Sequence, residues 1–222
     1  MKYLVFDSSS LINMTTNGLS NLLEKLKAGF KGEFLITKSV KYETMDHPLQ
    51  IERFEWGALR IKNLLDNKTL KMAEDIFDEK IIKQKAGEIL NQANNTFFKE
   101  NQAIHLIEAG EAETLAVSLL LTQKGLENLA VIDERTARML SENTSRLREL
   151  LENKLHTGIR NNSNKLEIEK VKIIRSTELA YLAYKKGLVE IKDKKALEAM
   201  LYALKFGGCS ITEKEILSIS KI

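Results

Sequence analysis

The stretch Tyr3-Leu-Val-Phe-Asp-Ser-Ser-Ser10 places a short apolar run directly before one acid and three serines. An apolar run of this length is typical of a buried strand in a parallel sheet. Asp7 and the serines that follow it can cap a helix that begins near Leu11. This stretch therefore predicts a strand, a turn and a helix, in that order.

The same strand-then-helix pattern returns further along the chain. Residues 33–37 and 129–132 are apolar runs that predict two more buried strands. Residues 110–121 predict a helix before the second of these strands, and residues 136–151 predict a charged amphipathic helix after it. Strands that alternate with helices predict an α/β fold with a central parallel sheet and helices on both faces.

The remaining segments are read as additions to this sheet. Residues 76–107 have widely spaced apolar positions and predict mostly helix, whereas alternation over residues 166–174 predicts a strand. Helices follow from Ser176 onwards. We therefore expect a main domain over residues 1–175, with a helical insertion at about 66–107, and a C-terminal helical extension over residues 176–222.

Composition excludes several classes of protein. The 222 residues are 43% hydrophobic and 29% charged, which is typical of a folded soluble chain, and the net charge of +3 is too small to imply a nucleic-acid partner. A single cysteine, Cys209, excludes disulfide scaffolds and cysteine-rich zinc sites. No apolar stretch approaches the roughly 20 residues that cross a bilayer, and residues 3–6 are too short for a signal peptide. We expect no membrane association and a cytoplasmic, reducing location.

Four carboxylates are expected at one edge of the sheet. Asp7 and Asp133 each follow a predicted strand, Glu43 lies in the first turn of a helix after another strand, and Glu111 opens the helix after Gly110. Ligands of open parallel sheets bind at this carboxyl edge. The alternative is structural: the two aspartates are helix N-caps and the two glutamates complement helix dipoles.

Charge repulsion within such a cluster indicates a cation. Two carboxylates in close contact repel by roughly 4 kcal/mol at an effective dielectric of about 20. Oxygen ligands without histidine or cysteine favour Mg²⁺ or Mn²⁺. Two such ions can activate a water and stabilise the leaving oxygen of a phosphodiester. Hydrolysis by this route needs only carboxylates, metal and water.

Helical geometry separates Glu111 from Glu113. At about 100° per residue, Glu111 lies on a polar stripe with Thr114, whereas Glu113 points about 200° away, among apolar residues such as Val117. Both glutamates therefore cannot reach one metal through the same face, and periodicity alone leaves the choice between them open.

Four motifs resemble those of the PIN-domain nucleases. They occur in the same order as in that family, over residues 1–12, 40–43, 110–116 and 131–138. The resemblance covers roughly residues 1–143. Residues 171–217 are similar to the tail of a prokaryotic PIN subgroup that carries extra C-terminal helices.

The resemblance implies a PIN-like α/β/α sandwich and metal-dependent cleavage of single-stranded RNA by an endoribonuclease. Asp7, Glu43, Glu111 and Asp133 match the family's acidic cluster of metal ligands, and the Ser9 hydroxyl supports Asp7. Alignment on Gly110 prefers Glu111 to Glu113. The resemblance also implies self-association, and it leaves open an antitoxin or another assembly partner. The long segment between residues 65 and 107 and the charged stretch over residues 142–170 depart from the family pattern.

A second function class stays open beside the nuclease. The alternative is a catalytically inactive PIN-fold module that binds RNA or protein. A dinucleotide site is excluded because the turn after the first strand has no glycine. Arg135, two residues past Asp133, is placed to reach a substrate phosphate, whereas the other basic residues after it predict a solvated, salt-bridged face. Phe54 and Trp56 are expected in a core or an interface rather than in a base-stacking platform.

Overall fold

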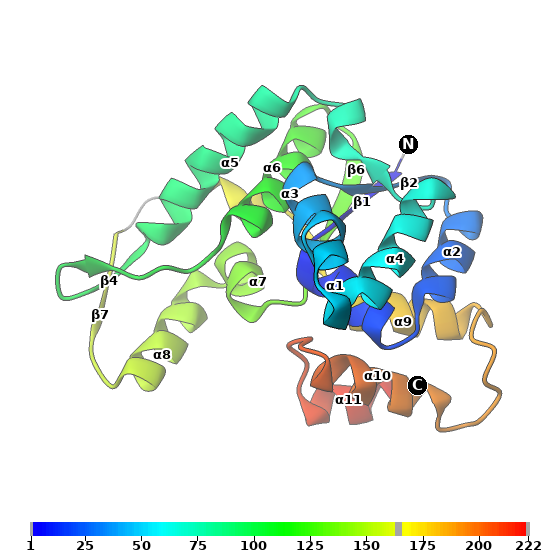
Figure 1. Cartoon of the computed structure of the whole chain (residues 1–222). Helices are drawn as coiled ribbons and strands as arrows, with labels where there is room; N and C mark the ends of the chain where they lie inside the picture. Colours follow the sequence, from blue (N-terminus) through cyan, green and yellow to red (C-terminus); the bar gives the residue numbers. More distant parts are fainter. Residues whose placement is uncertain (1, 163–165, 221–222) are drawn as a thin grey trace.

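Five parallel strands form the central sheet of the computed structural model, which describes residues 2–162 and 166–220 (Figure 1). Their order across the sheet is β3-β2-β1-β6-β8. The strands are β1 (Lys2–Phe6), β2 (Gly32–Ile36), β3 (Lys71–Met72), β6 (Glu127–Val131) and β8 (Ile173–Ile174). The expected α/β class with a central parallel sheet is confirmed. Strands β1 and β2 lie within one residue of their predicted positions, whereas β6 begins two residues before its predicted start.

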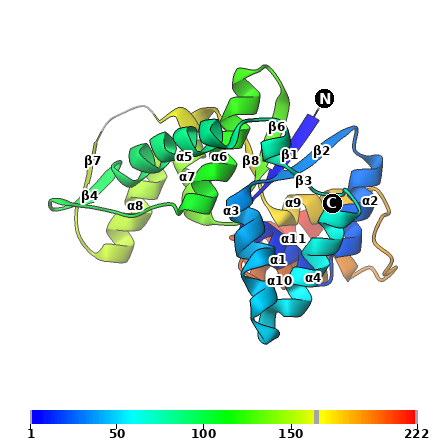
Figure 2. The same cartoon turned by 45° about the horizontal axis from the view of Figure 1, so that its top comes forward.

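Side chains alternate across the sheet and create two apolar faces. Phe6 and Phe34 belong to one core, which helices α1 (Ser8–Thr16), α2 (Ser20–Gly29), α4 (Glu52–Asp66) and α9 (Ser176–Lys185) complete. Val5 and Leu35 point to the other face, where α5 (Glu79–Asn94) and α6 (Ala109–Gln123) pack. Because successive strand residues face opposite sides, one sheet holds two helical layers (Figure 2). The result is a three-layer α/β/α arrangement.

The segment between α4 and α6 contains less helix than its sequence predicts. It holds β3, a 3₁₀ turn (Ala73–Asp75), α5 and a hairpin of β4 (Phe97–Lys99) and β5 (Gln102–Ala103). Strand β4 also pairs antiparallel with β7 (Ile159–Asn161), far from the main sheet (Figure 1). The expectation of mostly helix over residues 76–107 therefore holds for α5 and is wrong after Asn94. Glu100 occupies a left-handed conformation with φ of 54°, which closes the hairpin.

Two further segments differ from their predicted structure. The single helix expected over residues 136–151 is two helices, α7 (Arg135–Glu142) and α8 (Thr144–Leu155). Asn143 leaves the helical conformation between them, and its side chain accepts a hydrogen bond from the Arg146 N–H at 2.9 Å. The strand expected over residues 166–174 is mostly a 3₁₀ turn (Glu167–Lys170), with only the two residues of β8 in the sheet; residues 163–165 lie outside the described residues.

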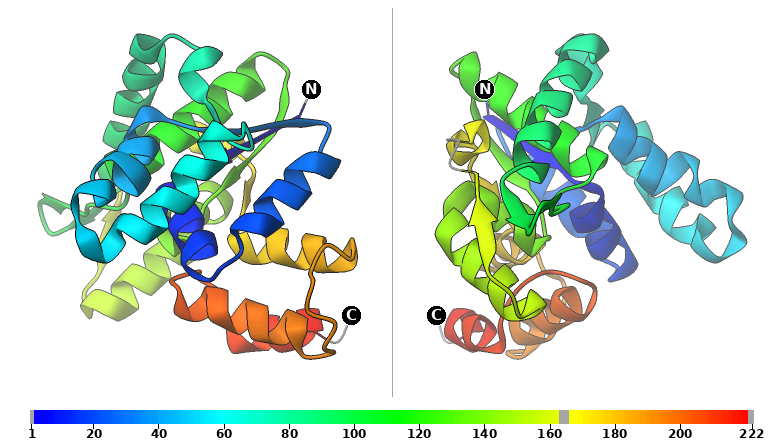
Figure 3. Two further views of the ribbon diagram at one scale, coloured as in Figure 1. Left: turned by 45° about the vertical axis from the view of Figure 1, so that its right-hand side comes forward. Right: turned by 90° about the vertical axis from the view of Figure 1, so that its left-hand side faces the viewer.

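The C-terminal helices belong to the same core as the first strand. Leu201 and Leu204 of α10 (Ala196–Phe206) and Ile216 of α11 (Glu213–Ser220) are fully buried in the cluster that contains Phe6. Figure 3 shows both helices, in orange and red, against the base of the molecule. Gly207 permits this approach, since a Cβ there would lie 2.0 Å from Asn13 Oδ1 of α1. Within the described residues, no helix is long and apolar enough to cross a membrane.

Candidate acidic site

The strand order places Asp7 and Asp133 at the point where the chain changes direction across the sheet. The chain runs from β1 outwards to β2 and β3, and returns to the other side of β1 as β6. Asp7 directly follows β1, and Asp133 lies two residues after β6, whose last residue pairs with the last residue of β1. In open α/β sheets the crevice at such a switch point is where ligands bind.

Asp7 is buried, and hydrogen bonds from Ser8 and Ser9 hold its carboxylate. Only 1% of its surface is exposed, and its Oδ2 atom accepts hydrogen bonds from the Ser9 N–H at 3.1 Å and from the Ser9 hydroxyl at 2.6 Å. Asp7 is therefore the N-cap of α1, and Ser9 supports it as expected. Its Oδ1 atom is buried with no hydrogen-bond partner. Burial raises the pKa of Asp7, and the charge of Glu43 adds to this increase against the hydrogen bonds from Ser9.

Glu43 reaches the site from a short π-helix, η1 (Tyr42–Asp46), which continues from α3 (Lys38–Lys41). The wider turn is closed by a hydrogen bond from the His47 N–H to the Tyr42 carbonyl at 3.0 Å. The Glu43 carboxylate lies against Gly110, where a Cβ would be 2.7 Å from Oε1. A glycine at position 110 therefore makes room for the Glu43 carboxylate beside the start of α6.

Glu111 faces Asp7 from the first turn of α6. Its Oε2 atom accepts a hydrogen bond from the Glu108 N–H at 2.9 Å, as part of a capping box, while Oε1 is buried without a partner. Burial raises the pKa of Glu111 to about 7, and the negative charges of Asp7 and Glu134 contribute to the increase. This carboxyl group therefore keeps its proton to a higher pH than an exposed glutamate does.

Asp133 lies at the same edge but is fully engaged in hydrogen bonds. Its Oδ1 accepts from the Ser176 N–H at 2.7 Å, and its Oδ2 accepts from the Ser176 hydroxyl at 2.7 Å and the Asn13 amide at 2.8 Å. Its carbonyl accepts from the Ser210 N–H at 3.0 Å. Asp133 therefore joins β6 to α1 and to the C-terminal segment. Its predicted role as a metal ligand stays a prediction.

Glu134, which the sequence reasoning did not single out, contributes to the acidic site. Its carboxylate accepts hydrogen bonds from the N–H groups of Thr136 and Ala137 and so caps α7. The alternative that Asp133 is the cap of the following helix is thus wrong, because its neighbour has that role. The signal was present, since an acid directly before Arg135-Thr-Ala can cap a helix as well as Asp133 can.

Glu113 is placed away from Asp7. It is buried on α6, and its charge contributes to raising the pKa of Lys83 on α5. The structure therefore brings Glu111 and not Glu113 next to Asp7. The difference follows from their separation around the helix, which the sequence showed without deciding which face pointed to the strand ends.

Arg135 lines a basic pocket beside this edge. The pocket has a volume of about 700 Å³, and its lining also includes Arg138, Arg146 and Ser210, whose N–H donates to Asp133, together with the acidic residues Glu142 and Glu215. None of the three arginines forms an ion pair among the described residues, and Arg138 Nε is buried without a hydrogen-bond partner. The salt-bridged face expected here is thus not formed by these arginines. Arg148 does pair with Glu152, at 3.0 Å.

The donor chemistry of the site fits a hard divalent cation at Asp7 and Glu111. Each residue has a buried carboxylate oxygen without a hydrogen-bond partner, and carboxylate oxygens are the ligands that Mg²⁺ and Mn²⁺ prefer. As placed, the carboxylates do not form a three-ligand cluster: no group of three or more His, Cys, Asp or Glu side chains in residues 2–162 and 166–220 is arranged to hold one ion. Asp7 and Glu111 therefore each present one unpartnered oxygen, and another carboxylate would have to move to complete a three-ligand group.

Comparison with known proteins identifies no relative. No family model matches the chain, and neither a curated protein nor a solved structure matches it. The PIN-like motifs thus remain a resemblance in sequence, and any assignment of activity has to be argued from the acidic site itself.

Proposed function

We propose that this chain is a PIN-like, metal-dependent ribonuclease that hydrolyses phosphodiester bonds of single-stranded RNA in the cytoplasm. The observation that carries this proposal is the pair of buried oxygens without partners, Asp7 Oδ1 and Glu111 Oε1, at the switch point of the sheet. Leaving two buried carboxylate oxygens without a donor is unfavourable for folding, so such a pair is characteristic of a ligand site.

The chain's own residues prepare this site for Mg²⁺ or Mn²⁺. Ser9 fixes the rotamer of Asp7, the Glu108 N–H fixes Glu111, and Gly110 leaves room for Glu43. A bound Mg²⁺ or Mn²⁺ ion supplies charge neutralisation for the phosphodiester and lowers the pKa of water. Asp133 is positioned to stabilise the edge of the sheet on which these groups stand.

The basic pocket supports a polyanionic substrate. Arg135, Arg138 and Arg146 form no ion pair among the described residues, although Glu142 and Glu215 also line the pocket, and guanidinium matches phosphate geometry. The net charge of +3 alone did not indicate a nucleic-acid partner. Opposite charges at the acidic edge and in the neighbouring basic pocket cancel in the whole-chain sum, so the sum does not report either of them.

The test is cleavage of an end-labelled, unstructured RNA by the purified chain with Mn²⁺. Asp7→Asn and Glu111→Gln are expected to reduce the rate at least 100-fold, because each removes a ligand oxygen's charge. Glu113→Gln, on the opposite face of the same helix turn, is the matched control and should cleave like the parent. Equal cleavage by the parent and Asp7→Asn would refute the proposal.

One observation favours the second candidate, a non-catalytic PIN-fold module that binds RNA or protein. Asp133, which the resemblance makes a metal ligand, is already saturated by Ser176 and Asn13. Calorimetric titration with Mn²⁺ separates the two candidates: saturable binding that Glu111→Gln abolishes supports the nuclease, and no heat at millimolar Mn²⁺ supports the module.

A further inference from the structure

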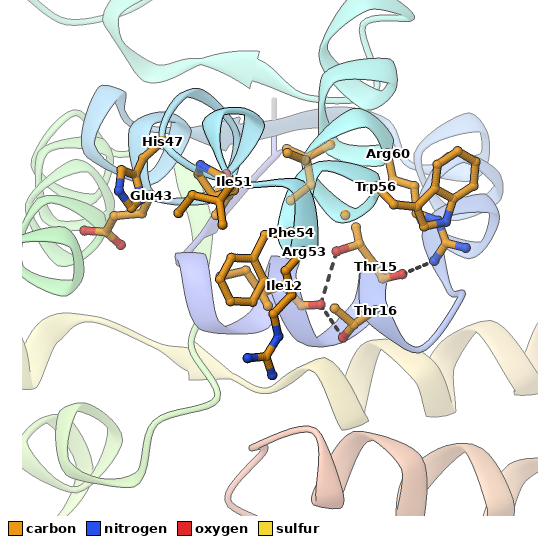
Figure 4. Close-up of a pocket in the computed structure, with 15 residues that line it drawn as sticks. Ile12, Thr15, Thr16, Glu43, His47, Ile51, Arg53, Phe54, Trp56 and Arg60 are labelled. Carbon is orange, nitrogen blue, oxygen red and sulfur yellow. Dashed lines mark hydrogen bonds between the residues drawn. The ribbon is translucent and has the colours of Figure 1, made fainter.

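A second pocket shares Glu43 with the acidic site. It has a volume of about 520 Å³ and is enclosed by α1, η1, the 3₁₀ turn η2 (Pro48–Gln50) and α4. These last three elements form an arm that extends from the body of the molecule (right-hand view of Figure 3). Glu43 lies at one end of the pocket and Trp56 at the opposite end, with Phe54 between them (Figure 4). The pocket is thus continuous with the acidic site through Glu43.

Aromatic rings line this pocket and are open to solvent. Trp56 is 68% exposed and Phe54 is 49% exposed, although α4 has a buried apolar stripe of its own in Ala58, Ile61 and Leu64. These two rings therefore contribute little to the core. The expectation that they lie in a core is wrong, which leaves an interface or a stacking platform as their role.

A guanidinium group lies over each ring. Arg53 is 5.3 Å from the centroid of Phe54, and Arg60 is 5.4 Å from the centroid of Trp56. Arg60 also donates to the Thr15 carbonyl of α1, which fixes it at the wall of the pocket. Neither arginine forms an ion pair among the described residues. The pocket thus combines exposed ring faces with positive charge that a phosphate can neutralise.

We propose that this pocket binds an unpaired base of the RNA strand, next to the phosphodiester at the acidic site. This proposal rests on the proposed ribonuclease function for its substrate class. Trp56 and Phe54 stack on the base, and Arg53 and Arg60 contact the flanking phosphates. A base inside a duplex is covered on both faces and cannot enter, so the pocket selects single-stranded RNA.

The chain carries its own reporter for this binding. Trp56 is the only tryptophan among the 222 residues, so the tryptophan emission of the full chain reports on this pocket alone. Titration in EDTA, where cleavage is absent, with an unstructured RNA of about 12 nucleotides should give saturable quenching. An abasic oligomer of the same length keeps the phosphates and should quench little. Equal quenching by both oligomers would overturn the proposal, because it would show phosphate binding without stacking.

Variants provide a second measurement through the anisotropy of fluorescein-labelled RNA. Phe54→Ala and Trp56→Ala should each weaken binding about ten-fold, and Trp56→Phe should retain most of the affinity because it keeps a ring. Phe206→Ala is the matched control, since Phe206 is 80% exposed on α10 with Lys205 over its ring, away from the pocket. Unchanged binding by the two alanine variants at positions 54 and 56 would refute the proposal.

The outcomes separate this inference from the proposed function. Cleavage by the parent without a response of Trp56 to RNA would overturn the base pocket and leave the nuclease intact. Base-dependent quenching without any cleavage would support the pocket and refute catalysis. A dimer in sedimentation that Trp56→Ala disrupts, with no effect of RNA on emission, would show that a second copy of the chain occupies the pocket and would overturn the proposal.

Discussion

Ser176 holds both carboxylate oxygens of Asp133, with its N–H on Oδ1 and its hydroxyl on Oδ2, each at 2.7 Å. Ser176 is the buried first residue of α9, so the carboxylate after β6 accepts a hydrogen bond from one of the N–H groups that the start of this helix leaves without a partner. The Asn13 amide, which also donates to the Leu204 carbonyl of α10, extends the same contact to a second C-terminal helix. Asp133 thus couples the sheet edge to the C-terminal helices.

Asp133→Asn is expected to destabilise the fold by about 2 to 3 kcal/mol. The oxygen of the new amide can accept the hydrogen bond from the Ser176 N–H, but its NH₂ group would face the NH₂ group of Asn13, so that two donors meet. The substitution also removes the negative charge that strengthens these buried hydrogen bonds. Urea unfolding measures the loss, and amide exchange should show its largest increase in α9 and α10. An unchanged midpoint would show that Asp133 is free for another task, such as binding a metal ion.

Loss of cleavage by an Asp133 variant therefore has two explanations, which the matched variant Ser176→Ala separates. This change leaves the carboxylate in place but removes the hydroxyl donor to Oδ2. If Asp133 acts only by holding the C-terminal helices, Ser176→Ala and Asp133→Asn should reduce stability and cleavage together. A stable Asp133→Asn protein that fails to cleave would instead place Asp133 among the ligands.

The stability that Glu111 contributes should fall as pH rises from about 4.5 to about 7. The pKa of Glu111 is about 7 in the folded chain against 4.5 as its ordinary value, so the folded state keeps a proton that the unfolded state releases in this window. The free energy of unfolding attributable to Glu111 is greatest below pH 4.5 and decreases by about 1 to 3 kcal/mol up to pH 7. The raised pKa of Asp7 acts in the same direction.

Glu111→Gln provides the measurement of this effect. Glutamine can still accept the Glu108 N–H and keep the capping box, but it has no proton to lose. Denaturation midpoints of this variant at pH 5 and pH 8 should differ less than those of the parent. Glu113→Gln should keep the parent's pH dependence, and a flat profile in the parent would contradict the buried, electrostatically coupled carboxyl group.

The sequence predicted the sheet edge well because the strands are short apolar runs that end in an acid. Asp7 and Asp133 were each predicted to follow a strand at the carboxyl edge of the sheet, and the structure adds that β1 and β6 are neighbours. What the sequence could not show is which donors surround each acid, since Ser176 and Asn13 are 43 and 120 residues from Asp133 in the chain. The separate roles of Asp7 and Asp133 depend on those long-range contacts.

Other differences have local causes that a pattern of apolar residues does not show. The π-helix at Glu43 shifts the register of that turn, and Asn143 divides one amphipathic segment into α7 and α8. The exposed position of Trp56 was missed for a related reason. An aromatic residue in a predicted helix is assigned to the core by default, and the sequence did not show that other residues of the helix form its buried stripe. In α4 that buried stripe consists of Ala58, Ile61 and Leu64.

Gly110→Ala should impair the site without unfolding the protein. The new methyl group would lie 2.7 Å from Glu43 Oε1, so the flexible Glu43 side chain must move away from the site. Alanine also favours the helix by up to about 1 kcal/mol over glycine, which offsets the contact. We expect at least ten-fold slower RNA cleavage with an unchanged or higher melting temperature.

Gly87→Ala in α5 is the matched control, because no atom lies within 4 Å of its added Cβ. A loss of activity in both variants would contradict the role assigned to Glu43.

Mn²⁺ should raise the melting temperature of the parent, and more at pH 8 than at pH 5. The ion binds the folded chain at Asp7 and Glu111, and protons compete for the same carboxylates when the pKa of Glu111 is about 7. At a free concentration of 100 times the Kd, binding stabilises by about 2.7 kcal/mol, which corresponds to an increase of roughly 5 to 10 °C for a chain of this size. Calorimetric scans with Mn²⁺ and with EDTA measure the shift, and Glu113→Gln serves as the control. If Asp7→Asn and Glu111→Gln show the same shift as the parent, the ion binds elsewhere and the two unpartnered oxygens do not form its site.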